Sequence, residues 1–227
     1  MGALEDGYLQ QIAAEALMDL AAEEDLLLRL ECRPGHYLVK GRVMVMVWPG
    51  DRVTDTLVEK INAAFVLGDQ RTATQDAEFS FKQLVEIAVR ALSPGINDPF
   101  TAIACVDRLG SGLCRLAERD LPSSCRFDAH GRLRLVAPGS TFAGIVDTSL
   151  NQIRQSARSN PAVAIRMLDA IAQVANHVRH AQDAACLQRH AAMIVRGARE
   201  TVPEADDLRA VEAAFTAASQ ALRGIES

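Results

Sequence analysis

FKQLVEIAVRALSPGINDPFTAIACVDRL, residues 81–109, is the stretch that decides the fold, because it predicts two helices joined by a short, stiff link. Apolar side chains lie nearly all round the first helix, which we expect over 75–92, so it should be buried at the centre of the protein. Ser93-Pro94-Gly95-Ile96 ends that helix, since proline disfavours helical backbone just before it. Asn97-Asp98-Pro99 then starts a second helix over 98–119, with a capping side chain and a proline in the first turn. The stretch therefore predicts a central buried helix pair.

Towards the N-terminus the pattern predicts helices over 8–22 and 55–67 and strands near 24–50. Gly35, Leu38, Gly41 and Met44 recur every three residues, a spacing that resembles the hammerhead turn of biotinyl- and lipoyl-type modules. A carrier of that kind needs a lysine at a hairpin tip, and Lys40 lies inside the turn instead. We therefore interpret the segment as a structural β element.

Towards the C-terminus the pattern predicts a β-hairpin near 124–137 and then a helical bundle from 140 to 227. Alanine-rich faces permit close helix packing, and a proline stands in the first turn of two of the predicted helices. The expected fold is α+β and mostly helical, in a single composite domain over 1–227 with its β-containing part in 1–139. The bundle helices are expected at 142–158, 161–181, 183–199 and 204–223.

Composition limits the function classes. The 227 residues carry a formal charge of −5, which gives no basic surface for nucleic acid. The longest wholly apolar run is short, so we expect no membrane span and a soluble chain. The five cysteines have no metal-ligand spacing, and their number suits free thiols in a reducing compartment. No catalytic or phosphate-binding motif is present, and the sequence predicts no cofactor.

Several polar residues surround the central helix pair. Glu86 and Arg90 are four apart and can pair on one helix face. We interpret the group as a buried structural network that fixes the Ser-Pro-Gly corner, with a ligand pocket or an oligomer contact as alternatives. The candidate cluster is Asp76, Glu86, Arg90, Asn97, Asp98 and Asp107.

Three other residues have the spacing of metal ligands. His177, His180 and Asp183 share one helical face, and imidazole and carboxylate groups suit zinc. Arginines flank the stretch and no further ligand is fixed by spacing. A solvated helix face is therefore the preferred interpretation, and we assign no metal.

The central stretch resembles a bacterial family of predicted membrane proteins, domain-of-unknown-function family number 2254. The resemblance extends over essentially the whole chain and includes the opening at residues 7–10 and the turn at 33–41. At His36 the family pattern usually has an acidic residue, which weakens any role for that position. The residues that carry the resemblance are Arg71-Thr72, Gln75-Asp76, Phe79, Gln83-Leu84, Ile87-Ala88, Arg90 to Pro94, Asn97 to Pro99, and Thr101-Ala102.

The resemblance implies a bundle of transmembrane helices followed by a soluble region on the cytoplasmic side. This chain would then be a truncated soluble region or a stand-alone relative. The expected function is assembly or regulation within a membrane protein, without catalysis. The alternative is an enzyme or small-ligand sensor with a pocket around Arg90, Asn97 and Asp98. We also expect a homo-oligomer built at least partly by the alanine-rich C-terminal helices.

Overall fold

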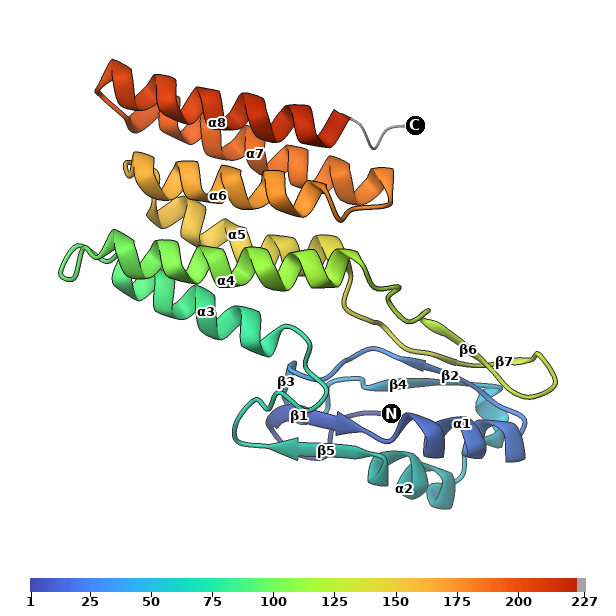
Figure 1. Cartoon of the computed structure of the whole chain (residues 1–227). Coiled ribbons are helices and arrows are strands. Elements are labelled where there is room, and N and C mark those ends of the chain that lie inside the picture. Colours follow the sequence, from blue (N-terminus) through green and yellow to red (C-terminus); the bar gives the residue numbers. More distant parts are fainter. Residues whose placement is uncertain (224–227) are drawn as a thin grey trace. The chain divides into compact units, whose positions relative to one another are not determined.

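The computed structural model describes residues 1–223, which form two compact units. Unit 1 consists of residues 1–79 and 121–140, and unit 2 consists of residues 80–120 together with those from 141 onward. Figure 1 labels the elements of both units. Within residues 1–223, no helix is both long enough and apolar enough to cross a membrane.

Unit 1 contains two small sheets. The first has the strand order β3-β1-β5 and is antiparallel throughout. The second has the order β4-β2-β7-β6 and is mixed, because β2 and β7 run parallel. The elements are β1 (Gly7–Ile12), α1 (Ala14–Glu23), β2 (Leu27–Leu30), β3 (Tyr37–Leu38), β4 (Val45–Trp48), a short 3-10 helix (Gly50–Arg52), α2 (Asp55–Ala63), β5 (Phe65–Gly68), β6 (Cys125–Phe127) and β7 (Leu133–Val136).

Two predictions for unit 1 are wrong. The helix expected over 8–22 begins only at Ala14, because residues 7–12 form strand β1. β1 pairs with β3 on one side and β5 on the other, and these long-range hydrogen bonds override the local helical pattern. Strands are also not confined to 24–50 and 124–137, since β1 and β5 lie outside both ranges.

Unit 2 is helical, and Figure 1 shows its helices stacked side by side. α4 packs on α5 and α6, α6 packs on α7 and α8, and α5 packs on α7. Gly110 lets α4 approach α6 closely, because a Cβ there would lie 3.2 Å from the Cβ of Ala170. The helices are α3 (Phe79–Ala91), α4 (Pro99–Ala117), α5 (Phe142–Ser156), α6 (Pro161–Ala175), α7 (Ala181–Thr201) and α8 (Ala205–Arg223).

The helix-dominated α+β fold is confirmed, while the central position expected for the first helix is not. α3 buries Val85 and Ala88, but Ile87 is 49% exposed on its other side. α4 and α6 provide much of the core instead, through fully buried side chains such as Leu109 and Met167. An apolar pattern nearly all round a helix therefore did not predict its depth here, because α3 has helical neighbours on one face only.

Candidate functional site

The predicted cluster separates into local contacts. Asp98 caps α4: its carboxylate accepts hydrogen bonds from the backbone N–H groups of Phe100 and Thr101, both at 3.1 Å, and from the Thr101 hydroxyl at 2.6 Å. The bond from the Thr101 hydroxyl is the main cause that lowers the pKa of Asp98. The predicted cap is thus present, and it stabilises the start of α4 as caps commonly do.

The other five residues of the predicted cluster do not converge on a common partner. Glu86 and Arg90 pair at 2.8 Å, and both side chains are about 70% exposed, at 69% and 71%. Asp107 pairs with Arg166 of α6 at 3.3 Å, and Asp76 lies in unit 1 beside Arg71. Asn97 adopts a left-handed backbone with φ of 48° in the α3–α4 corner. Within residues 1–223, these six residues do not form one hydrogen-bonded network.

His177, His180 and Asp183 do not form a metal-ligand group in residues 1–223 either. His177 lies 2.7 Å from Glu118 through its Nδ1 atom. His180 is exposed and precedes α7, where its carbonyl accepts a hydrogen bond from the backbone N–H of Asp183. In the part of the chain that the structure describes, the group with metal-ligand geometry is a different one, formed by Asp147, Cys186 and His190.

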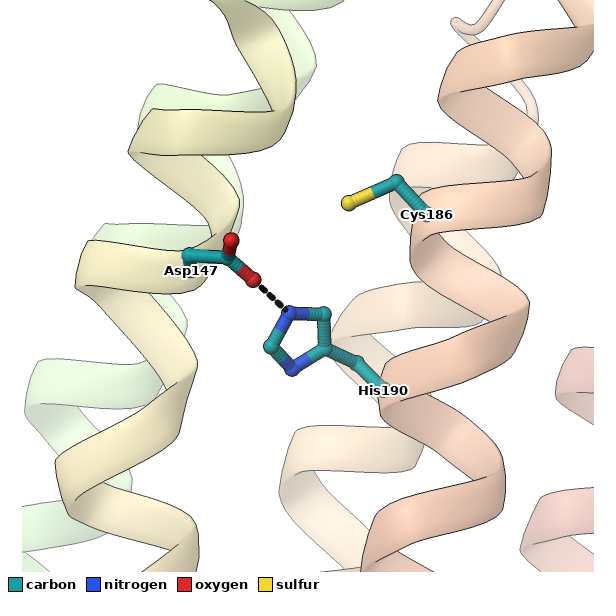
Figure 2. Close-up of side chains that lie close together, drawn as sticks. All are labelled: Asp147, Cys186 and His190. Carbon is teal, nitrogen blue, oxygen red and sulfur yellow. Dashed lines mark hydrogen bonds and ion pairs between the residues drawn. The ribbon is translucent and has the colours of Figure 1, made fainter.

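Figure 2 shows this cluster, with Asp147 on α5 facing Cys186 and His190 on α7. His190 is fully buried, and its Nε2 lies 2.7 Å from the Oδ1 atom of Asp147. Arg189 reaches the same carboxylate oxygen at 2.6 Å and the Cys186 Sγ at 3.6 Å. The cluster therefore joins α5 to α7 through one carboxylate with two nitrogen donors.

Three observations argue against a metal ion in this cluster. The guanidinium of Arg189 already supplies the positive charge between Asp147 and Cys186. A metal on Nε2 of His190 would also place the ring proton on Nδ1, which is buried with no hydrogen-bond partner in residues 1–223. Metal-bound histidines normally donate that proton to a partner. Burial further raises the pKa of the Cys186 thiol, which disfavours the thiolate that a metal needs.

Burial shifts the pKa values of His190 and Asp147 in opposite directions. Burial lowers the pKa of His190, and the hydrogen bond to Asp147 only partly offsets it. Burial raises the pKa of Asp147, but the hydrogen bonds from His190 and Arg189 lower it by more. The neutral imidazole therefore donates its Nε2 proton to an ionised carboxylate.

Acidification is expected to destabilise unit 2 through His190. Because the pKa of His190 is lowered in the folded protein, the unfolded chain takes up the proton first as the pH falls. The contribution of His190 to the free energy of unfolding is therefore fully present above the ordinary histidine pKa of about 6.5 and decreases below it. The contribution of Asp147 is lost only at lower pH, below its ordinary pKa of about 3.9. Urea unfolding followed by far-UV circular dichroism between pH 7.5 and 5 measures this slope.

The matched variants are His190→Gln, which keeps a donor for Asp147, and His180→Gln at an exposed position. We expect a flatter pH dependence for His190→Gln and an unchanged one for His180→Gln. Identical slopes in all three proteins would show that His190 binds its proton equally in the folded and unfolded states.

A groove of about 720 Å³ runs between α3 and α5, and Asp147 forms part of its wall. Val85 and Val89 of α3 line it with apolar surface, while Lys82, Glu86 and Arg90 of the same helix line it with charges of both signs. The α5 rim carries hydroxyl and amide groups from Thr148, Asn151 and Gln152. Of the three residues around which the sequence suggested a pocket, Arg90 lines this groove, whereas Asn97 and Asp98 do not.

Unit 1 holds a separate buried ionic network. Asp76 is 5% exposed and Glu78 is 4% exposed. Nε of Arg71 donates to the Asp76 carboxylate at 2.8 Å, and Arg33 pairs with Glu78 at 2.6 Å. Arg33 also donates to the Ser140 hydroxyl at 2.6 Å, which ties the two chain segments of unit 1 together. Each of these four charged side chains has an ionic partner of opposite charge.

Comparison with known proteins agrees with the sequence resemblance. The chain matches the family described as "Predicted membrane protein (DUF2254)" over residues 1–173. Uncharacterized proteins of Mycobacterium bovis and Mycobacterium tuberculosis are each 31% identical to it over 220 residues, which is 93% of this chain and 42% of theirs.

The chain thus spans less than half the length of these curated relatives. No solved structure matches it. The family description extends over unit 1 and over α3 to α5, so it includes the buried network of unit 1 and the groove between α3 and α5. This chain therefore belongs to the DUF2254 family of predicted membrane proteins.

Proposed function

We propose that this chain is a regulatory region of a larger membrane protein and that it acts by binding a small organic ligand between α3 and α5. The groove of about 720 Å³ carries the proposal, because its size is typical of small-molecule sites and its lining combines apolar and polar side chains. Membership of a predicted membrane protein family supplies the setting. The free cysteines among the described residues support a cytoplasmic position, which thiol labelling of a full-length relative in intact cells would test.

The lining favours an amphiphilic organic anion. Val85 and Val89 can cover an apolar body, while Arg90 can receive a carboxylate or phosphate group. Arg90 is held by Glu86 in an exposed pair, and such pairs contribute only about 0–1 kcal/mol, so a ligand can replace Glu86 at small cost. The amides of Asn151 and Gln152 offer donors and acceptors on the opposite rim.

The proposed role is non-catalytic. Among residues 1–223, the Asp147–His190 pair borders the groove; the Asp147 side chain is 40% exposed, but the histidine has no exposed surface from which to reach a ligand. The neighbouring Cys186 has a raised pKa because of burial, so it stays a thiol and a weak nucleophile. These features support a binding site over an enzyme.

Thermal melts with a panel of amphiphilic organic acids, each beside its neutral amide, test the proposal. A ligand at a hundredfold excess over its Kd stabilises by about 2.7 kcal/mol, which raises the melting temperature of a chain this size by roughly 5–10 °C. We expect some acids to do this and their amides to do so less.

Two variants of α3 locate the effect. Val89→Trp fills the groove, whereas Gln83→Trp places the same ring at an exposed position outside the groove lining. The stabilisation should disappear in Val89→Trp and persist in Gln83→Trp. A panel without any effect, or an effect that survives Val89→Trp, would contradict the proposed site.

A further inference from the structure

The mixed sheet of unit 1 has one face that buries the core and one that does not. Leu28, Leu30 and Val45 point to the core and are at most 4% exposed. The residues between them point the other way, and the register places Arg29 opposite Met46 and Leu27 opposite Trp48. Side chains alternate along a strand, so this second face forms a continuous row across β2 and β4.

Large apolar side chains remain exposed on this face. Met46 is 37% exposed and Trp48 is 41% exposed, and Val43, which precedes β4 and lines a hollow together with Arg29 and Met46, is 45% exposed. The guanidinium of Arg29 lies over the Trp48 ring, 5.6 Å from its centre. A hollow of about 420 Å³ continues the row towards residues 42 and 43. We call the whole surface the β4 patch, which consists of Arg29, Glu31, Arg42, Val43, Met46 and Trp48.

We propose that the β4 patch is a self-association face that binds the same patch of a second copy of this chain. Tryptophan, methionine and arginine are the residue types enriched at the centre of protein interfaces, where they supply most of the binding energy. A sheet with one uncovered apolar face is also commonly covered by packing a second sheet against it. This inference does not depend on the groove between α3 and α5.

The charges of the patch select a second copy over a lipid surface. Arg29 is paired with Glu31 at 2.6 Å, which leaves Arg42 as the surplus cation. One surplus charge gives little attraction to anionic lipid, which needs a cluster of basic residues. A patch with both signs is complementary to itself under a two-fold axis, where Arg42 of one copy can face Glu31 of the other. Arg42 makes no ion pair among residues 1–223, so it is available for that contact.

The proposed interface differs from the oligomer contact that we expected from the sequence. The sequence assigned self-association to the alanine-rich C-terminal helices. In unit 2 many of those alanines are already inside the core of one chain, including Ala164, Ala175, Ala191 and Ala198. The β4 patch keeps its apolar groups on the surface and is therefore the better interface.

Analytical ultracentrifugation at 5–100 µM tests the proposal with the wild type and five variants. The wild type is expected at twice the 24.5 kDa mass of one chain at the upper concentrations. Met46→Lys should weaken the dimer at least tenfold, since it buries a charge in the interface. Val66→Lys makes the same change at a residue that is 46% exposed in the other sheet and should leave the dimer intact. A charge exchange, Glu31→Arg with Arg42→Glu, should restore association that either change alone weakens.

Far-UV circular dichroism confirms that each variant is folded before its mass is measured. A wild type that stays monomeric at 100 µM overturns the proposal, as does a dimer unaffected by Met46→Lys. Sedimentation with vesicles of phosphatidylglycerol and phosphatidylcholine tests the alternative occupant, a lipid surface. A monomer that binds these vesicles through Met46 and Trp48 also overturns the proposal.

Discussion

Asp76→Ala is expected to lower the free energy of unfolding of unit 1 by about 3–5 kcal/mol, because it leaves a largely buried guanidinium without its carboxylate. The side chain of Asp76 is 3% exposed and that of Arg71 is 20% exposed, so solvent can do little to replace the lost pair. The same carboxylate also accepts the backbone N–H of Glu78 at 3.1 Å, which would lose its partner as well. Such a loss is a large share of a typical stability of about 5–15 kcal/mol.

Urea unfolding followed by tryptophan fluorescence measures this effect in the correct unit. Trp48 is the single tryptophan and lies in unit 1 with Asp76. Asp69→Ala removes a carboxylate from an exposed position in the same unit and should change stability by less than about 0.5 kcal/mol. If Asp76→Ala leaves the midpoint unchanged or raises it, Asp76 is held in place for binding and this network becomes a ligand-site candidate.

Gly35→Ala is expected to destabilise unit 1 more than Gly41→Ala, although both glycines have left-handed backbones, with φ of 88° and 85°. Left-handed backbone costs a residue with a Cβ roughly 1–2 kcal/mol, and at Gly41 nothing lies within 4 Å of the added atom. At Gly35 the Cβ would lie 2.2 Å from Oδ2 of Asp76 and 2.7 Å from Nη2 of Arg71. The substitution must therefore displace the buried ion pair in addition to straining the turn.

A double-mutant cycle separates these two contributions. In an Asp76→Ala background the obstructing carboxylate is absent, so adding Gly35→Ala should cost only about the 1–2 kcal/mol of the strained turn. Additive effects of the two changes, measured by the same fluorescence-detected unfolding, would show that the turn and the ion pair are energetically independent.

Interactions between residues that are close in sequence predicted helix starts correctly. Asp98 caps α4 and Pro99 occupies its first turn, as the sequence indicated, because a cap depends on residues within one turn. Asn160 and Pro161 start α6 in the same way. The helix-dominated fold class followed from such signals together with apolar periodicity.

Contacts between distant residues were the ones that sequence patterns missed. The strand at residues 7–12 depends on partners near residues 37 and 67, and its short apolar run fits a helix equally well. Cys186 and His190 have a visible four-residue spacing on one helix, but Asp147 reaches them from 43 residues earlier than His190. Arg33 and Glu78 carry no pattern that joins them. Only the fold brings these charges together.

The order in which the chain is synthesised has a consequence for unit 1, because residues 80–120 interrupt it. β2 ends at Leu30 and its parallel neighbour β7 begins only at Leu133. At translation rates of about 5–20 residues per second, the ribosome adds β7 roughly 5–20 s after β2. During that interval the β2–β4 pair has an unpaired β2 edge, which is a template for wrong pairing. Nascent chains stopped before residue 133 should therefore need chaperones, and a recombinant fragment that ends near residue 80 would lack two strands of its own sheet, β6 and β7.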